Sequence, residues 1–179
     1  MLRIVLAAFA ALLLSPGLAR ADVGSAAAGG FVIEAEAEVA ASPDAVWRDL
    51  ARVGRWWNSA HTYSGAAANM RLDPRAGGCW CERWAGGSVE HGRVLAAFTH
   101  EGARTLRLEA ALGPLQELGV QAVLSFTILP AGDGSKVTMS YRVAGDPALN
   151  LEVMAAPVNG VMMEQFGRLV RYSGTGSPD

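Results

Sequence analysis

Segments in which every second residue is apolar recur along most of this chain. The clearest runs from residue 31 to residue 39, where Phe31, Ile33 and Val39 share one face with two alanines while three glutamates occupy the other. Strict alternation of this kind predicts a β-strand with one buried and one wet face. Further strand-like segments with glycine- or proline-containing turns between them follow at residues 70–72, 79–84, 89–98, 105–112, 120–128 and 137–143. Strands joined in this way predict an antiparallel meander.

Two helical regions interrupt and end this pattern. Ser-Pro-Asp at residues 42–44 supplies an N-cap, a first-turn proline and a first-turn acid, which predict a short helix ending at Gly54 and a second short helix or turn after it. Beyond Asp146, apolar residues recur at three- and four-residue spacing and predict a long C-terminal helix that Pro157 kinks or divides. The predicted fold is therefore α+β, a curved antiparallel sheet of about seven strands around a long C-terminal helix, with two short helices after the first strand.

The first 21 residues have the pattern of a secretory signal peptide. Arg3 gives a positive start, residues 4–14 form an unbroken apolar run, and Ala-Arg-Ala at residues 19–21 is a small-residue cleavage site. We expect cleavage after Ala21 and a periplasmic or secreted protein. No later segment reaches 18 consecutive apolar residues, so we expect no stable membrane insertion of the mature chain.

The rest of the chain is short enough for one domain. Residues 22–29 are rich in alanine, glycine and serine and predict a flexible lead-in. Residues 30–173 carry the alternating and helical patterns and predict a single domain. Residues 174–179 are expected to form a disordered tail.

The composition argues against several classes of protein. The 179 residues carry 15 Lys and Arg against 17 Asp and Glu, a formal charge of −2, whereas a nucleic-acid binder needs a basic stripe. Two cysteines cannot make a disulfide scaffold, and the known fingerprints of nucleotide, zinc-protease and serine-hydrolase sites do not occur. We expect no cofactor and no nucleic-acid partner, and the sequence does not indicate an oligomeric state.

The order of elements and several motifs resemble the START / polyketide-cyclase / SRPBCC superfamily. The motifs are Ala-Ser-Pro-Asp-Ala-Val-Trp at 41–47, Arg-Trp-Trp at 55–57, Gly-Gly-Cys-Trp-Cys-Glu at 77–82, Gly-Gly at 86–87 with Val94, and Gly-Pro-Leu at 113–115. The third is similar to that of an exported bacterial subgroup. The resemblance covers about residues 30–173 and implies a helix-grip fold, in which a curved sheet and a long C-terminal helix enclose an apolar cavity. Lipid and hormone binders, cyclases and co-chaperone-like proteins share this fold, so the fold alone does not give the function.

The alternating apolar residues predict the lining of such a cavity. Small residues on the same face, Gly92 and Ala122 among them, leave volume that a solid core would fill. Polar side chains such as Glu82, Tyr141 and Gln165 would orient a ligand. The expected ligand-binding residues are Trp80, Glu82, Trp84, Leu108, Leu124, Phe126, Met139, Tyr141, Val158, Met162 and Gln165.

Glu82 and His91 are the candidates for chemistry. Glu82 alternates with Trp80 and Trp84, so on a concave face it would sit among indoles and its pKa would rise above the ordinary value. His91 lies on the next strand, close to opposite Glu82. The alternation of the following apolar residues favours a His91 that points outward as half of a solvent-facing pair, although a shift of one residue in register would turn it inward.

Cys79 and Cys81 lie on one strand face, two residues apart. In an extended strand such Cα atoms are about 6.5–7 Å apart, the upper limit for a bridge. Plain thiols, a disulfide within the pair or between chains, and a metal site completed by His91 all stay open. The spacing is not that of a usual zinc site, so we expect no metal. His61, just after the paired tryptophans, is a candidate for the pocket entrance.

Two functions fit these features best. The first is an exported protein that binds a small hydrophobic ligand, a lipid or a polyketide-like molecule, in the cavity between sheet and helix. The alternative is an enzyme of the cyclase/dehydratase or hydrolase type, in which Glu82, with His91 or His61, acts as acid or base. A protein-interaction module is a third reading, which export makes less attractive.

Overall fold

The structure is a computed structural model that describes residues 20–179. Most of the expected signal peptide therefore lies outside the described residues. The strands are β1 (Arg20–Ala27), β2 (Gly30–Val39), β3 (Met70–Leu72), β4 (Cys79–Trp84), β5 (Gly87–His100), β6 (Ala103–Glu109), β7 (Gln121–Ala131) and β8 (Gly134–Ala144). The helices are α1 (Pro43–Ala51), α2 (Val53–Trp56) and α3 (Glu152–Thr175), with short 3₁₀ turns η1 (Ser59–His61), η2 (Ala67–Asn69), η3 (Gly113–Gln116) and η4 (Pro147–Leu149).

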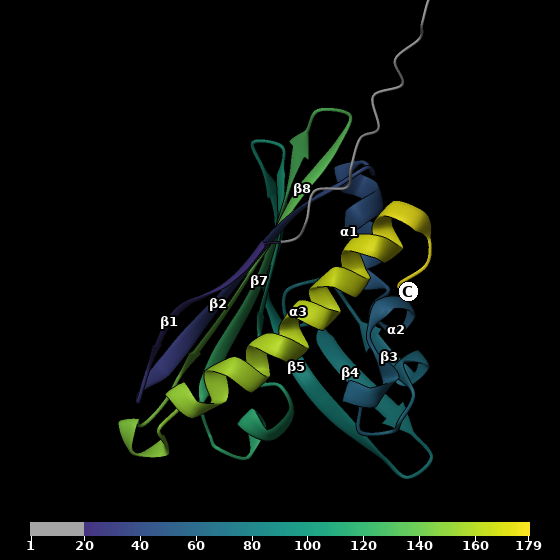
Figure 1. Cartoon of the computed structure of the whole chain (residues 1–179). Coiled ribbons are helices and arrows are strands. Elements are labelled where there is room, and N and C mark those ends of the chain that lie inside the picture. Colours follow the sequence, from purple (N-terminus) through teal and green to yellow (C-terminus); the bar gives the residue numbers. More distant parts are fainter. Residues whose placement is uncertain (1–19) are drawn as a thin grey trace, which may run out of the picture.

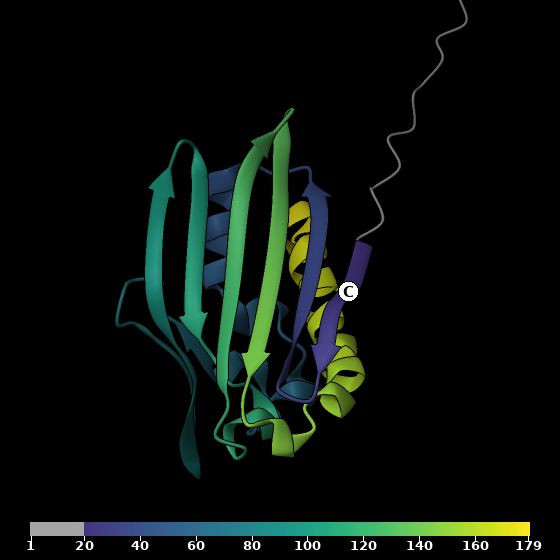
Figure 2. The ribbon, with the colours of Figure 1, turned by 90° about the vertical axis from the view of Figure 1, so that its left-hand side faces the viewer.

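The eight strands form one antiparallel sheet in the order β1-β2-β8-β7-β6-β5-β4-β3. Strands β3 to β8 are the predicted meander, and α1 and α2 lie in the connection that carries the chain from β2 to β3. The sheet is strongly twisted, and α3 runs diagonally across one of its faces (Figure 1). In the view turned by 90°, the strands lie in front of the helices (Figure 2). The α+β helix-grip prediction is confirmed, with one strand more than expected.

The additional strand is β1, which includes most of the expected flexible lead-in. Its residues pair antiparallel with β2 from Arg20 opposite Glu36 to Ala27 opposite Gly30. The small residues of this segment indicated flexibility, but the free edge of β2 offers a row of backbone donors and acceptors that a neighbouring strand satisfies. The lead-in prediction was therefore wrong for residues 22–27.

The C-terminal helix is longer and less interrupted than expected. Pro157 lies inside a single helix that runs to Thr175, so it does not divide the helix. Gly176, with a φ of 82°, ends the helix in the left-handed conformation that glycine tolerates. Beyond it Asp179 forms an ion pair with Arg168, so the last residues fold back on α3 rather than forming the expected tail. None of the described helices is long and apolar enough to cross a membrane.

The sheet face beneath α3 is filled by side chains. Leu108, Leu124 and Met139 are at most 2 % exposed and belong to one continuous hydrophobic core. Gly92 leaves no free volume, because a Cβ there would lie 2.7 Å from the Cβ of Ala110. The small residue allows two strands to approach each other closely. In the sequence, a glycine needed for this reason looks the same as one that leaves room for a cavity.

Two β-bulges change the facing of residues along β5. One lies opposite the step from Trp80 to Cys81, and the other lies between Val94 and Ala96. The second bulge shifts the alternation by one residue, so Phe98, expected inside with Val94, is 48 % exposed. The first bulge determines the position of His91.

Candidate functional site

A pocket of about 500 Å³ opens beside the first half of α3. Its walls come from the loop after α2, from β5, from the segment around η3 and from α3. The lining residues are Trp57, Ala60, His61, Thr62, Tyr63, His91, Leu112, Gly113, Pro114, Glu117, Met154, Pro157, Val158, Val161 and Met162. The volume lies within the range of small-molecule sites, and most of the lining is apolar.

The pocket brings together only part of the expected site. Val158 and Met162 line it as the sequence predicted, and His91, which was expected to point outward, lines it as well. The other expected apolar residues do not. Five side chains of the sheet face pack in the core instead: Leu108, Leu124, Phe126, Met139 and Tyr141. The described pocket therefore lies toward one end of α3, beside the loops.

Tyr141 has a structural task in that core. Its hydroxyl donates to the carbonyl of Ala110 at 2.8 Å and accepts from the amide of Leu112 at 3.1 Å. Burial raises the pKa of Tyr141. The side chain thus holds the segment that leads from β6 into the pocket wall at Leu112, rather than facing the pocket.

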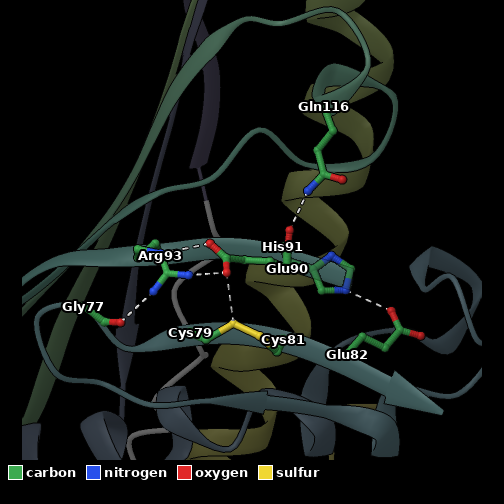
Figure 3. Close-up of a disulfide and its surroundings, with 8 residues drawn as sticks. All are labelled: Gly77, Cys79, Cys81, Glu82, Glu90, His91, Arg93 and Gln116. Atoms are coloured by element: carbon green, nitrogen blue, oxygen red, sulfur yellow. Dashed lines mark hydrogen bonds and ion pairs between the residues drawn. A yellow bond between two sulfur atoms is a disulfide. The ribbon is translucent and has the colours of Figure 1, made fainter. Parts of the chain in front are cut away.

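A buried polar pair, His91 and Glu82, adjoins the pocket. His91 Nε2 lies 2.9 Å from Glu82 Oε2, and the two residues are 4 % and 0 % exposed (Figure 3). Glu82 also accepts backbone hydrogen bonds from Tyr63 at 3.1 Å and Ser64 at 2.6 Å. Glu82 itself does not line the pocket. His91 is the member of the pair that faces the pocket, and Glu82 stands behind it.

The hydrogen bonds decide the charge of this pair. Burial acts to raise the pKa of Glu82, but the hydrogen bonds from Ser64, Tyr63 and His91 outweigh it and hold the pKa below the ordinary value. The expectation of a raised pKa was wrong, because the sequence did not reveal these donors. Burial lowers the pKa of His91, and Glu82 offsets this only in part. At neutral pH, therefore, Glu82 is ionised, His91 is neutral and the imidazole donates through Nε2–H.

The inward position of His91 results from the first bulge. Trp80 lies opposite Gly92 and Cys81 opposite Glu90, so His91 is the extra residue of β5. In regular pairing His91 would lie opposite Cys81, on the outer face. The bulge brings His91 to the same side as Gly92. The favoured outward position was therefore wrong, and the alternative shift in register is what the structure shows.

The remaining expected site residues lie outside the pocket lining. Trp80 is buried with its ring edge against Trp57, at a centroid distance of 4.9 Å. Trp84 is only partly buried and lies over the hairpin turn, where a Cβ on Gly86 would come within 2.9 Å of its indole nitrogen. Gln165 is 1 % exposed, and its side-chain oxygen accepts a hydrogen bond from the backbone amide of Asn58 at 2.8 Å. Trp80 and Gln165 support the pocket from behind.

The loop after α2 supplies residues that the sequence analysis largely missed. Trp57 and Tyr63 line the pocket, and the indole of Trp57 donates to the carbonyl of His61 at 2.8 Å. His61 also lines the pocket and lies 3.0 Å from Glu164 of α3. Hydrogen bonds from Asn58 and His61 lower the pKa of Glu164. The polar, irregular sequence of this loop carries no periodic signal, and only the position of His61 after the paired tryptophans pointed to it.

Cys79 and Cys81 form a disulfide with each other. Of the alternatives left open by the sequence, the bond within the pair is the one observed. The Cα atoms are 5.4 Å apart, closer than in a regular extended strand, so β4 is contracted at this point. The nearest further metal-binding type of side chain is Glu90, whereas His91 lies on the inner face. With both sulfurs joined, no thiolate pair is left to bind a metal.

The buried pair predicts a specific dependence of stability on pH. A histidine whose pKa is lower in the folded than in the unfolded protein stabilises the fold above its ordinary pKa of 6.5 and loses that contribution as the pH falls. Glu82, also with a lowered pKa, loses its contribution below its ordinary 4.5. Urea unfolding should therefore show a free energy that falls between about pH 7 and about pH 5.

Substitution assigns this effect to His91. In His91→Gln the amide still donates to Glu82 but does not titrate, so the fall over this interval should largely disappear. His100→Gln is the matched control, because His100 lies on the same strand with its side chain 77 % exposed. If both variants kept the wild-type dependence, His91 would not be a buried neutral group.

Comparison with known proteins agrees with this architecture. Residues 31–174 match the family described as polyketide cyclase / dehydrase and lipid transport. No curated protein sequence matches the chain. The fold is similar to CalU16 from Micromonospora echinospora, with a TM-score of 0.53, 17 % identity and coverage of 90 % of this chain and 85 % of that chain. It is also similar to the Aha1 dimer from Colwellia psychrerythraea, with a TM-score of 0.56, 16 % identity and coverage of 81 % and 97 %.

At these identities the structural likeness shows the fold alone. The family match is broader evidence, because it spans the sheet from β2 onward and nearly all of α3. The chain therefore belongs to the polyketide cyclase / dehydrase and lipid transport family, of the SRPBCC type.

Proposed function

We propose that this protein binds a neutral hydrophobic small molecule in the pocket beside α3. The observation that carries the proposal is the chemistry of the lining. Met154, Val158 and Met162 of α3 face Leu112 and Pro114 across an apolar space of about 500 Å³. Such a concave apolar space with a few convergent polar groups is the usual form of a small-molecule site.

The charged residues around the pocket restrict the class of ligand that it can bind. Within the described residues, the pocket lining contains neither lysine nor arginine, and its carboxylate is Glu117. Glu164 lies beside His61, which lines the pocket. An anionic headgroup in this pocket would lose water without gaining a cation, which is costly. The proposal therefore favours an uncharged lipid or polyketide-like molecule over a fatty acid.

One nitrogen atom of the pocket can accept a hydrogen bond from such a ligand. Because Glu82 accepts from Nε2–H of His91, the lone pair of the neutral ring is on Nδ1. No hydrogen bond among the described residues occupies that nitrogen. We assign it as acceptor for a ligand hydroxyl. The signal-peptide pattern adds the location to the proposal, a periplasmic or secreted binder, and this part rests on the sequence.

Matched ligands test the proposal. Dodecanol and dodecanoate have the same chain length and differ at the headgroup. Calorimetric titration at about pH 7.5 should give an affinity for dodecanol at least about tenfold higher than for dodecanoate, because the carboxylate finds no partner. Equal affinity, or tighter binding of dodecanoate, would contradict the assigned ligand class.

A pair of substitutions on α3 tests the location. Val158→Trp puts a large side chain into the pocket and should lower dodecanol affinity at least about tenfold. Ala156→Trp adds the same group at an exposed position outside the lining and should leave the affinity unchanged. An unaffected Val158→Trp protein would place the ligand elsewhere.

Enzymatic proton transfer is the second candidate, and the buried His91–Glu82 pair favours it. A neutral imidazole oriented by an ionised carboxylate is an effective general base. His91 would contact the substrate, and Glu82 would fix its tautomer, a different division of roles from the acid or base first expected of Glu82. A cyclase/dehydratase-type reaction would use this base in the same pocket.

The two candidates differ in what leaves the pocket. A candidate polyketide-type ligand is incubated with wild type and with His91→Gln. The small molecules are then extracted and analysed by liquid chromatography and mass spectrometry. A binder returns a molecule of unchanged mass and chromatographic retention from both proteins, whereas a cyclisation without loss of water would change the retention alone. A dehydratase returns a molecule lighter by one water from wild type only, and that result would replace the binding proposal with the enzymatic one.

A further inference from the structure

The disulfide and the first bulge of β5 lie side by side. Cys79 and Cys81 close a ring across Trp80, and the register between β4 and β5 shifts at the step from Trp80 to Cys81. The bond therefore spans the place where His91 becomes the extra residue (Figure 3). Two features that each disturb regular pairing meet at one point of the sheet.

Geometry connects the two features. The disulfide holds the Cα atoms of its cysteines 5.4 Å apart, whereas two steps of an extended strand cover about 6.6 Å. The three-residue strand β3 pairs regularly with β4 across this step, whereas the long strand β5 does not. A bulge in the neighbour accommodates the bend and increases the local twist.

Other contacts hold the bulge from the outer face and from the pocket wall. Glu90, the residue before His91, places Oε2 3.8 Å from the sulfur of Cys79 and forms an ion pair with Arg93. Gln116 of η3 donates to the backbone carbonyl of Glu90 at 2.6 Å. The same turn supplies Gly113 and Pro114 to the pocket lining. Gln116 thus connects the bulge to the pocket wall, and the Glu90 side chain lies beside the disulfide.

We propose that the Cys79–Cys81 disulfide is a positioning element of the pocket: it bends β4 where β5 bulges and so turns His91 inward. This inference deepens the proposed function and rests on it for its consequence, the polar anchor of the ligand. The register itself does not depend on any ligand.

The redox state of Cys79 and Cys81 then sets the position of the His91 imidazole. A dithiol reductant breaks the S–S bond, supplies two electrons and two protons to give two cysteine thiols, and itself closes to a cyclic disulfide. With the bond broken β4 extends. The core fixes Gly92 opposite Trp80, and regular pairing from there places His91 opposite Cys81, on the outer face.

The register can be read directly by NMR. In the oxidised wild type, cross-strand NOEs should join position 81 to position 90, and the His91 ring should contact Tyr63 and Trp80, whose ring centroids lie 5.8 and 5.7 Å away. In the Cys79→Ser/Cys81→Ser double variant, position 81 should instead pair with position 91 and the His91 ring contacts should vanish. Reduction of the wild type with dithiothreitol should give the same pattern.

A control separates the bond from its surroundings. Glu90→Gln alters the same outer face and leaves the disulfide intact, so the wild-type NOE pattern should persist. The proposal is overturned if the double variant and the reduced protein keep position 81 opposite position 90 with His91 against Tyr63. Global unfolding of both would overturn it as well, because the proposed effect is confined to the β4–β5 hairpin beyond Trp80.

Ligand binding supplies an independent readout. Dodecanol affinity should fall severalfold in the double variant and stay unchanged in Glu90→Gln. If oxidised wild type binds no dodecanol while the register shifts as expected, the proposed function fails and the positioning role stands. If dodecanol binds and the register does not respond to the disulfide, the positioning role fails and the proposed function stands.

Discussion

A carboxylate without exposed surface must find hydrogen-bond donors, and the way Glu82 finds them organises the pocket. The backbone amides of Tyr63 and Ser64 bring the loop after α2 onto β4, and the imidazole of His91 connects β5 to the same carboxylate. An ionised buried carboxylate left unpaired would cost several kcal/mol. The requirement therefore fixes loop, strand and imidazole together, and leaves His91 facing an apolar space.

Much of the fold follows from local rules that the sequence displays. Strand-like segments between turn residues mark seven of the eight strands. Ser42, just before Pro43, was predicted to cap α1, and its hydroxyl accepts a hydrogen bond from the amide of Ala45. The sequence did not predict strand β1, because its residues have no strong preference for the extended conformation. Its structure comes from the unpaired edge of β2, which is a property of the neighbour rather than of the segment.

The site was less predictable because it depends on register and on loops. A single extra residue in β5 reverses the facing of His91, and alternation alone cannot place that residue. The pocket-lining loop with Trp57 and Tyr63 is irregular, so its residues carry no periodic signal. The sequence did single out Glu82 and His91 as neighbours, because strand spacing and a short turn place them close in either register.

The small residues of the sheet led to the wrong place for the cavity. Gly92 serves the close approach of β5 to Ala110, and large side chains such as Leu124 and Phe126 fill the space beneath α3. Small side chains have the same appearance in a sequence whether they leave a void or allow two backbones to meet. The pocket instead opens where α3 passes the loops, at Val158 and Met162.

The central claim is that ligand enters this pocket while the core beneath α3 stays closed. The methionines provide reporters for both regions, because Met154 and Met162 line the pocket whereas Met139 and Met70 are buried in the core. In a ¹³C-methyl NMR titration with dodecanol, the account predicts shifts of the Met154 and Met162 methyl signals and none for Met139 and Met70. Shifts of Met139 as large as those of Met162, or no response of any methionine, would contradict it.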